Sequence, residues 1–423
     1  MKVCVIGSGG REHALARRLY DSPSVTAVYA VPGSAAMAEV ATCENLDWAD
    51  TPALLSFLKA NGVDLVVIGP EAPLVAGLGD TLRDAGYAVF GPSKAAARLE
   101  GSKVFAKEIM KKYNIPTAAY GVFSDVAEAK KFIAEVGAPI VIKADGLAAG
   151  KGVVVAMTLD EANAAVDDML AGNRFGDAGH IVVIEEFMAG EEASLLAFVD
   201  GNTIVPMMAV QDHKRIFDGD KGPNTGGMGT YAPAPVMTDA LTKEAYDKIL
   251  VPMVQAMNAE GTPYSGCLYA GLMITDQGPK VVEFNARFGD PETQVLMPLL
   301  KSDLGTIMMA CAKGELTPDL VQWHDGSAAC VILASAGYPE SSHKGDVISG
   351  DLGHTESVYV FHSGTAYKDD AYVTAGGRVL GVVGKGKDLQ SALDTAYDRV
   401  KAISFDGMQF RKDIGQKAFK HLK

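Results

Sequence analysis

The sequence predicts a multidomain protein with an N-terminal doubly wound parallel sheet, a central α+β core and a small C-terminal α+β domain. Its 423 residues exceed the size of one typical domain. Over the first hundred residues, short apolar runs alternate with helical stretches, an order typical of parallel α/β sheets. The pattern of polar motifs then changes twice. We therefore expect domains at 1–102, 103–325 and 326–423, with a flap subdomain at about 121–190.

The first domain is expected to contain four strands with helices between them. In such sheets, ligands bind at the carboxyl ends of the strands. Three of these ends carry loops of ligand-binding type, at 7–13, 69–73 and 91–94. Backbone N–H groups at the start of the first helix, with Gly9, Gly10 and Arg11, could bind one phosphate. The expected strands are 2–7, 25–31, 65–69 and 88–91, and the expected helices are 11–20, 52–61 and 76–85.

The first loop is not a dinucleotide fingerprint. Gly7 and Gly9 fit that pattern, but Glu12 occupies the third glycine position. The second strand ends without the acidic residue that would hold a ribose. A nicotinamide oxidoreductase is therefore disfavoured, and a tight strand-to-helix turn remains the alternative to a phosphate site.

A glycine-rich segment at 145–152 joins two expected strands, 139–144 and 153–156. It is not a P-loop, because Gly152 replaces the Ser/Thr that follows the lysine and the glycine spacing is one residue short. We interpret it as a flap over a triphosphate. Lys143 lies in the first, otherwise apolar strand, and a buried lysine requires an anionic partner. A functional role is therefore expected for Lys143.

A third apolar run, 181–187, ends in two carboxylates and leads into Glu191 and Glu192. A strand that enters a short hinge can offer backbone groups to adenine, and a nearby carboxylate can accept hydrogen bonds from ribose hydroxyls. Glu192 is the better candidate for this role, whereas Glu191 is more typical of a solvated turn charge.

The segment 281–287 gives the clearest geometric prediction. Side chains alternate along a strand, so Glu283, Asn285 and Arg287 should share one face. Oxygen ligands on a rigid strand suit Mg²⁺, and Arg287 can pair with an anionic substrate. The alternative is a solvated polar face, which the following Gly-Asp-Pro-Glu makes less attractive. A second polar segment, 211–230, also combines carboxylates, amides, cations and glycines.

After residue 325 the polar motifs become sparse. This last domain is expected to close over the site rather than to supply its chemistry. Strands are expected at 328–335, 358–362 and 378–384, and a helix at 389–402; one further helix is expected in the central domain, at 103–113.

Composition excludes several classes of function. The formal net charge of −14 disfavours nucleic-acid and anionic-membrane binding. No apolar stretch approaches the roughly 18 residues of a membrane span. The apolar run at the start of the chain is too short for the core of a signal peptide. Five scattered cysteines argue against a disulfide framework, and the histidines lack zinc-ligand spacing. A cytoplasmic protein is expected.

These motifs together resemble the ATP-grasp superfamily, in which two α+β subdomains grip ATP. The resemblance rests on Lys143, the 146–152 flap, Glu185–Phe187 with Glu192, and the pair Glu283 and Asn285. Four longer motifs, at 7–13, 69–74, 211–229 and 283–292, are similar to those of the phosphoribosylamine–glycine ligase family along the whole chain. This resemblance implies ligation of glycine to 5-phosphoribosylamine, with ATP and Mg²⁺ (or Mn²⁺), through glycyl phosphate.

The resemblance also implies roles for individual residues. Lys143, Arg287 and Asp212 would be catalytic, and Glu283 and Asn285 would hold the metal ion. The nucleotide would contact Lys103, Lys143, Gly150, Lys151, Gly152, Glu185, Glu186, Phe187 and Glu192. The substrates would contact Gly9, Gly10, Arg11, Pro70, Glu71, Asp212, Lys214, Arg287, Asp290 and Glu292.

Two alternatives stay open at this point. Another ATP-grasp enzyme, such as a carboxylase, would share the nucleotide and metal residues but not the 211–229 motif. A regulatory nucleotide-binding protein should have lost Lys143, Glu283, Asn285 or Arg287, and all four are present. A monomer that binds small molecules, without nucleic acid or membrane, is expected.

Overall fold

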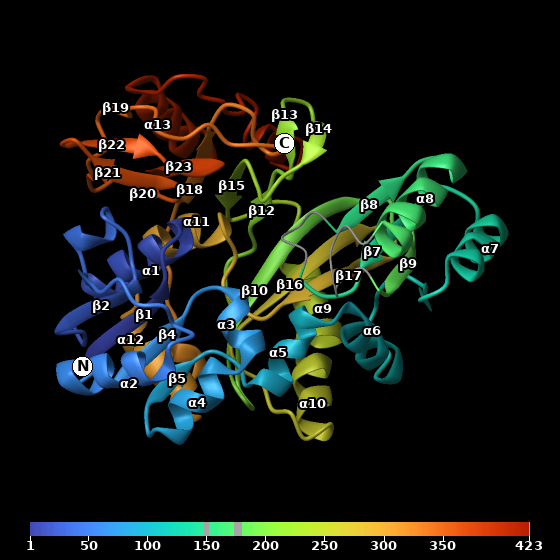
Figure 1. Cartoon of the computed structure of the whole chain (residues 1–423), viewed down its shortest axis with the longest axis horizontal. Coiled ribbons are helices and arrows are strands. Elements are labelled where there is room, and N and C mark those ends of the chain that lie inside the picture. The colour runs from blue at the N-terminus through green and yellow to red at the C-terminus, as the bar shows by residue number, and fades with distance from the viewer. Residues whose placement is uncertain (148–151, 173–179, 423) are drawn as a thin grey trace.

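The computed structural model describes residues 1–147, 152–172 and 180–422 (Figure 1). The N-terminal part forms the expected parallel sheet, in the order β3-β2-β1-β4-β5. Both faces of β1 are buried, because Val3 and Val5 pack into one apolar cluster and Cys4 and Ile6 into another. The strands are β1 Lys2–Gly7, β2 Ala27–Pro32, β3 Thr42–Cys43, β4 Leu65–Ile68 and β5 Ala88–Phe90.

Two of the three helices expected in this part are present, the third is divided near residue 76, and the helices at 37–39 and 94–101 were not expected. A single helix at 76–85 was expected, but Gly77 ends one helix and precedes the next with a φ of 94°. This left-handed conformation favours glycine and turns the chain. The helices are α1 Gly10–Tyr20, η1 Met37–Glu39, α2 Thr51–Asn61, α3 Glu71–Ala76, α4 Leu78–Asp84 and α5 Lys94–Gly101.

The central part contains two antiparallel four-stranded sheets (Figure 1). The smaller has the order β6-β9-β7-β8, and its β7–β8 pair is the expected hairpin, with Ile140 opposite Ala156. The larger has the order β11-β10-β16-β17. The strands are β6 Tyr120–Phe123, β7 Ile140–Ala144, β8 Val153–Ala156, β9 Val182–Glu186, β10 Glu191–Asp200, β11 Ile204–Pro206, β16 Ser265–Thr275 and β17 Gly278–Asn285.

Helices cover these sheets and connect them to the N-terminal part. Helix α6 begins at Lys103, where the Ser102 side chain accepts a hydrogen bond from the Phe105 N–H. None of the helices in the described ranges is both long and apolar enough to cross a membrane. The helices between residues 103 and 320 are α6 Lys103–Lys112, α7 Val126–Val136, α8 Leu159–Val166, η2 Asp167–Ala171, α9 Asp239–Ala245, η4 Tyr246–Leu250, α10 Val251–Ala259, α11 Glu292–Leu299, α12 Leu304–Lys313 and η5 Pro318–Leu320.

The C-terminal sheet has the order β12-β15-β18-β23-β20, so it includes two strands from the 211–230 segment. The strands and the helix expected after residue 325 are present. The domain limits at 102 and 325 stay a prediction. The elements are β12 Gln211–Asp212, β13 Arg215–Phe217, β14 Lys221–Asn224, β15 Gly229–Ala232, β18 Ser327–Ala334, β19 Ser349–Gly350, β20 Val358–His362, β21 Thr365–Lys368, β22 Ala371–Thr374, β23 Arg378–Gly386, α13 Leu389–Lys401, β24 Ile403–Ser404 and η6 Gln416–Lys420.

Candidate active site

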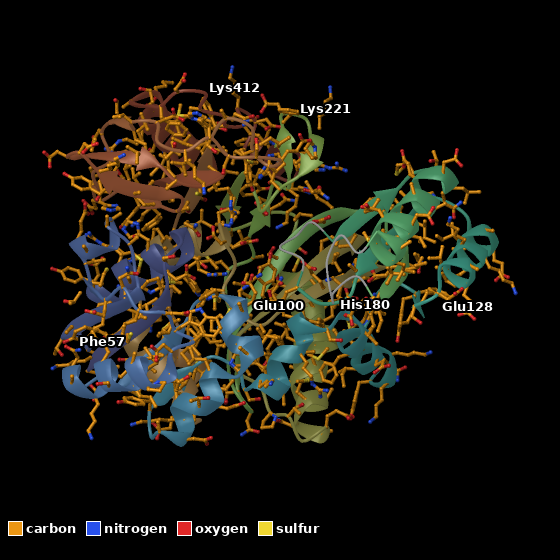
Figure 2. All side chains as sticks on the ribbon, in the orientation of Figure 1. Phe57, Glu100, Glu128, His180, Lys221 and Lys412 are labelled. Carbon is orange, nitrogen blue, oxygen red and sulfur yellow. The ribbon has the colours of Figure 1, made fainter. Side chains whose placement is uncertain are left out.

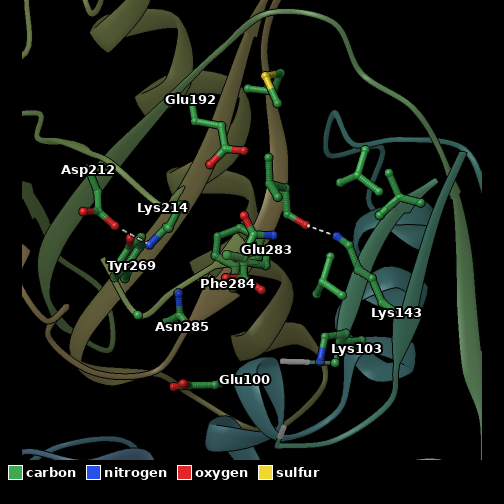
Figure 3. A pocket seen from close by; sticks show the side chains of 18 of the residues that line it. Glu100, Lys103, Lys143, Glu192, Asp212, Lys214, Tyr269, Glu283, Phe284 and Asn285 are labelled. Carbon is green, nitrogen blue, oxygen red and sulfur yellow. Dashed lines mark hydrogen bonds and ion pairs between the residues drawn. The ribbon is translucent and has the colours of Figure 1, made fainter. Parts of the chain in front are cut away.

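One cavity, with a volume of about 1090 Å³, brings together most of the residues singled out in the sequence. It opens between the two central sheets and reaches the N-terminal and C-terminal parts. Figure 3 shows Glu283 between Lys143 on one side and Asp212 with Lys214 on the other. The predicted residues that line it are Arg11, Glu71, Lys103, Lys143, Gly152, Glu185, Glu186, Phe187, Glu192, Asp212, Lys214, Glu283, Asn285, Arg287, Asp290 and Glu292.

The other predicted residues are not part of this lining. Gly9, Gly10 and Pro70 lie in the N-terminal loops but are not among the described residues that line the cavity. Gly150 and Lys151 lie outside the described residues, so their predicted contacts with a nucleotide stay predictions.

Lys143 has the anionic partner that its burial required. Its Nζ lies 3.0 Å from Glu185 Oε2 and donates a hydrogen bond of 3.0 Å to the Val282 carbonyl. Glu185 also holds a second buried lysine, Lys107, at 3.3 Å. Burial lowers the pKa of Lys107 to about 8, although Glu185 opposes this. Two ammonium groups thus share one carboxylate at the β7–β9 edge of the cavity.

Lys103 adds a third cation beside this pair. Its Nζ donates a hydrogen bond of 3.0 Å to the Gly146 carbonyl, at the described start of the flap. Burial lowers its pKa, and the charge of Lys143 adds to this effect. The Asp145 carboxylate accepts a hydrogen bond of 2.6 Å from the Lys103 N–H and so fixes the start of α6. This surplus of positive charge suits a polyphosphate.

The hinge that follows β9 also lies on the cavity wall. Glu186, Phe187 and Gly190 line the cavity, and the Glu186 carboxylate accepts a hydrogen bond of 3.1 Å from the Ala119 N–H. Glu192, at the start of β10, points into the same space (Figure 3). Burial raises the pKa of Glu192, and the negative charges of Glu283 and Asp212 raise it further, whereas Lys214 lowers it.

Glu283 and Asn285 lie on β17 and reach the cavity from the same strand, as the alternation predicted. Glu283 is exposed to the cavity, and Asn285 Oδ1 accepts a hydrogen bond of 3.4 Å from Arg287 Nη2. Within the described ranges, no group of three or more His, Cys, Asp or Glu residues could hold a metal ion. Two oxygen donors fit Mg²⁺ because this ion commonly keeps waters and takes further ligands from substrate phosphates.

Arg287 follows β17 and is held by two carboxylates from the N-terminal part. Its Nη2 lies 2.8 Å from Glu100 Oε1, and its Nε lies 3.3 Å from Glu71 Oε2. These anions raise the pKa of Arg287 although burial opposes its charge. Burial also raises the pKa of Glu100, although Arg287 lowers it. The guanidinium is therefore fixed and charged at the cavity wall.

A second ionic cluster lies on the opposite wall. Lys214 Nζ is 2.6 Å from Asp212 Oδ2 and 4.0 Å from Glu292 Oε1. Although burial opposes its charge, these carboxylates raise the pKa of Lys214 well above its ordinary value. The Tyr269 hydroxyl donates a hydrogen bond of 2.6 Å to Glu292 Oε1. Lys214 engages Oδ2 of Asp212, whereas Oδ1 has no hydrogen-bond partner among the described residues and could accept one from an N–H donor.

Glu12 explains why the first loop departs from the dinucleotide fingerprint. Its carboxylate accepts hydrogen bonds from the Gly9 N–H at 2.8 Å and from Arg11 Nε at 2.6 Å. A Cβ atom at Gly7 or Gly69 would overlap the Glu12 side chain, so both glycines make room for it. The Gly9 N–H that was predicted to bind phosphate is therefore already paired in this structure.

Asp290 connects this loop to the C-terminal sheet. Its Oδ2 accepts a hydrogen bond of 3.3 Å from the Arg11 N–H, and its Oδ1 lies 3.5 Å from Arg378 Nη2. Although burial opposes this, Arg378 and Arg11 hold the pKa of Asp290 below its ordinary value. The C-terminal sheet thus supplies a cation to the cavity, whereas the sequence predicted that it would only close over it.

The sequence did not predict several residues of the lining that make distinct contacts, among them Glu100, Lys107, Tyr269, Arg378 and Lys417. Glu100 could have been found as a lone acid at the end of a helix otherwise rich in alanine, and Lys107 through its position four residues after Lys103. Nothing in the local sequence distinguishes Tyr269 or Arg378, which reach the cavity through the pairing of β16 with β10 and of β23 with β18.

Comparisons with known proteins identify the family of the whole chain. The phosphoribosylglycinamide synthetase family matches through its N domain over residues 1–100, its ATP-grasp (A) domain over 101–293 and its C domain over 328–417. The phosphoribosylamine–glycine ligase of Escherichia coli O157:H7 is 53% identical over 423 residues, with 99% of each chain covered. That of Halalkalibacterium halodurans is 51% identical over 99% of this chain and 97% of its own.

Solved structures show the same fold. A phosphoribosylamine–glycine ligase from Thermotoga maritima aligns with a TM-score of 0.86 and 35% identity, over 98% of this chain and 100% of its own. A biotin carboxylase from Campylobacter jejuni aligns with a TM-score of 0.75 at 13% identity, over 97% and 92% of the two chains, which shows the fold alone. The chain therefore belongs to the phosphoribosylamine–glycine ligase (phosphoribosylglycinamide synthetase) family, and it is an ATP-using carbon–nitrogen ligase with an ATP-grasp domain.

Proposed function

We propose that this chain joins glycine to 5-phosphoribosylamine and consumes ATP, giving glycinamide ribonucleotide, ADP and phosphate. The observation that carries this proposal is the joint placement, in one cavity, of the Lys103–Lys143 cation pair and the Asp212–Lys214–Glu292 cluster. The lysine pair suits a triphosphate, and the Asp212–Lys214–Glu292 cluster suits small substrates that carry amines and anions. A ligase must bind the nucleotide and the small substrates at the same time.

The nucleotide is proposed to lie between the two central sheets. Lys103 and Lys143 would hold its phosphates, and Gly150, Lys151 and Gly152 of the flap would cover them. The hinge at Glu185, Glu186 and Phe187 would contact the base, and Glu192 the ribose. Support comes from the surplus of positive charge around Glu185, which two lysines share.

The metal ion is proposed to be held by Glu283 and Asn285. When bound, Mg²⁺ (or Mn²⁺) would neutralise charge on the phosphates. The adjacent Lys103 and Lys143 would add charge neutralisation from the protein itself.

The carboxylate of glycine is a poor electrophile and must be activated. Its oxygen would attack the γ-phosphorus of ATP, giving glycyl phosphate and ADP. The amine of phosphoribosylamine would then attack the carbonyl carbon and displace phosphate. In this scheme Arg287, fixed by Glu100 and Glu71, would neutralise the carboxylate and the transferred phosphoryl group.

The small substrates are proposed to lie along the opposite wall. Asp212 and Glu292 offer carboxylate oxygens that can accept hydrogen bonds from an amine, beside Lys214 and Asp290. The ribose phosphate would lie towards the N-terminal loops at 9–11 and 70–71. Arg11, which lines the cavity, is the cation there that supports this assignment.

ADP release with Mg-ATP tests the function directly. Glycine and phosphoribosylamine would be omitted in turn, with the amine generated in place from ribose 5-phosphate and ammonia. The proposal expects ADP only when both substrates are present. ADP formation without glycine would instead indicate another ATP-grasp activity, and ATP binding without any ADP formation would indicate a regulatory protein.

A monomer in the cytoplasm is also proposed, and the five free cysteines support a reducing compartment.

A further inference from the structure

A buried charge cluster near the C-terminus holds a hairpin of the cavity wall. Arg411 is only 1% exposed, although it is charged. Its Nε and Nη2 each lie 2.8 Å from one oxygen of Asp413, and its Nη1 lies 2.9 Å from Asp220 Oδ1. The same Nη1 donates a hydrogen bond of 3.1 Å to the Arg215 carbonyl. A buried guanidinium is tolerated because its donors are satisfied in this way.

The contacts of this cluster converge on the turn between β13 and β14. The Gly219 N–H donates a hydrogen bond of 2.9 Å to Asp413 Oδ2, and the Lys412 N–H donates one of 2.8 Å to Asp218 Oδ1. Lys417 Nζ lies 2.7 Å from Asp220 Oδ2. We call Arg411, Asp413 and Lys417 the C-terminal clasp.

Besides the clasp, the buried side chain of Ile216 anchors the first strand of the hairpin in an apolar cluster. The hairpin is a two-stranded sheet of its own, and all four residues of β14, Lys221–Asn224, are exposed. An isolated two-stranded hairpin is marginally stable in water. Lys221 of the hairpin and Lys412 beside the clasp lie at the outer rim of the molecule (Figure 2). The clasp therefore holds the turn at 218–220, which Ile216 does not reach.

The position of the hairpin matters because its inner side forms part of the cavity. Arg215, Asp220 and Asn224 line the cavity, as does Thr225 just after the hairpin. The chain enters β13 directly from Lys214, whose ammonium group pairs with Asp212. A displaced hairpin would open this wall to water and shift Lys214.

We propose that the C-terminal clasp couples ATP cleavage to ligation by keeping the β13–β14 hairpin closed over the acyl phosphate, with Arg411 and Asp413 as positioning residues. This inference rests on the proposed function. When the hairpin opens, water attacks the carbonyl carbon of glycyl phosphate and the bond from that carbon to the phosphate oxygen breaks. Glycine and inorganic phosphate are released, and the proton of the water goes to solvent. ADP then forms without glycinamide ribonucleotide.

The test compares Asp220→Asn and Arg411→Lys with the unmodified chain. Asp220 is exposed, and asparagine tolerates its left-handed φ of 56°, so Asp220→Asn should leave the turn and the fold intact. Arg411→Lys keeps the charge but loses the bidentate contact with Asp413. The ratio of ADP to glycinamide ribonucleotide is expected to rise severalfold above one in both variants, with the KM for ATP changed less than about twofold. Arg399→Gln, which breaks an ion pair with Asp351 in the same C-terminal part, is the matched control and should keep the ratio at one.

Hydrogen exchange of residues 215–224 without substrates separates this inference from the proposed function. Loss of the charge that pairs with both Arg411 and Lys417 should make exchange in the hairpin roughly tenfold faster in Asp220→Asn. Unchanged exchange would overturn the clasp, even if the unmodified chain proved not to be this ligase. Faster exchange with a ratio that stays at one would overturn the coupling role. An unmodified chain without substrate-dependent ADP release would overturn the proposed function, while the exchange result would still decide whether the clasp holds the hairpin.

Discussion

Arg287 Nη2 lies 2.8 Å from Glu100 Oε1, and this pair joins the end of β17 to the last turn of α5. The other Glu100 oxygen accepts a hydrogen bond of 2.7 Å from the Ala286 N–H. Glu100 lies in the interior, between the N-terminal and central parts (Figure 2). One buried carboxylate thus fixes both the backbone and the side chain of the residue proposed to neutralise the transferred phosphoryl group.

Glu100→Gln should therefore reduce catalysis through Arg287. The amide keeps the shape of the side chain but loses the charge that holds the guanidinium. We expect kcat/KM for glycine to fall roughly tenfold to a hundredfold, the cost of a misplaced catalytic group. The KM for ATP should change less, because the side chain of Glu100 contacts Arg287 and the Ala286 N–H rather than the lysines proposed to hold the phosphates.

Glu108→Gln is the matched control for this variant. Glu108 is exposed on α6, and its replacement should leave both constants unchanged. Equal losses for glycine and ATP in Glu100→Gln, together with a collapse of the melting temperature, would show that Glu100 only supports the fold.

Lys143→Gln should impair phosphoryl transfer more than it impairs folding. Glu185 would keep Lys107 as a partner, so no buried carboxylate is left without a cation. Loss of one cation at the transferring phosphate should lower kcat by roughly a hundredfold to a thousandfold. Steady-state kinetics and thermal unfolding measure the two effects.

Lys130→Gln provides the comparison for Lys143→Gln. Lys130 makes an exposed ion pair with Asp167, and such pairs contribute at most about 1 kcal/mol. A kcat for Lys143→Gln within twofold of the unmodified chain would remove Lys143 from the phosphate site.

The sequence predicted the fold and the cavity well where the signal is local. Alternation along residues 281–287 predicted the shared face of Glu283 and Asn285, and an apolar strand around Lys143 predicted a buried cation with an anionic partner. Its actual partner, Glu185, was instead expected at the nucleotide. The choice of partner depends on the β7–β9 pairing, which places Val141 opposite Glu185. Lys143, two residues after Val141, therefore lies diagonally opposite Glu185 on the same face of the sheet.

Contacts between distant segments could not be read from the sequence. Arg378 reaches Asp290 only because β23 pairs with β18 in a sheet that also includes β15. Likewise, the clasp at Arg411 holds a turn almost two hundred residues earlier in the chain. No periodicity or motif spacing encodes such pairings, because they depend on how separate layers pack.

Glu283→Gln should weaken the response to Mg²⁺ with little effect on stability. Glu283 is exposed to the cavity, and the variant leaves Asn285 as the remaining protein ligand. The Mg²⁺ concentration at half-maximal turnover should rise roughly tenfold or more, since loss of supporting groups alone costs metal sites 10–100-fold. A titration of turnover with Mg²⁺ at saturating ATP measures this.

The control for the metal site is Glu260→Gln, which removes an exposed partner of Lys112 far from the cavity. Its Mg²⁺ response should match that of the unmodified chain. A large drop in the melting temperature of Glu283→Gln, with the Mg²⁺ response preserved, would mark Glu283 as a structural residue.

His213 should make the fold sensitive to acid. Its Nδ1 donates a hydrogen bond of 2.9 Å to the Gly229 carbonyl, and its Nε2 accepts one of 3.3 Å from the Gly415 N–H. Burial lowers its pKa to about 4, from 6.5 in the unfolded chain. Protonation of Nε2 would break the contact with Gly415, which lies between Asp413 and Lys417 of the clasp.

The sign of the effect follows from proton binding. Between pH 6.5 and 4 the unfolded chain binds a proton at this histidine and the folded chain does not. The stability that His213 contributes is therefore fully present above pH 6.5 and is lost as the pH falls towards 4, by at most about 3 kcal/mol. His354 and His362, whose pKa values burial also lowers to about 4, add losses of the same sign.

Urea unfolding at several pH values measures this dependence. His213→Gln, which cannot take up the proton, should unfold with a shallower loss of free energy between pH 6.5 and 4 than the unmodified chain. His343→Gln is the control: His343 is exposed, and Asp346 raises its pKa, so its contribution to stability grows as the pH falls, opposite in sign to that of His213. Its removal should therefore not make the loss of free energy shallower. Equal slopes in His213→Gln and the unmodified chain would mean that His213 is already protonated in the folded protein, which contradicts its role as an acceptor from Gly415.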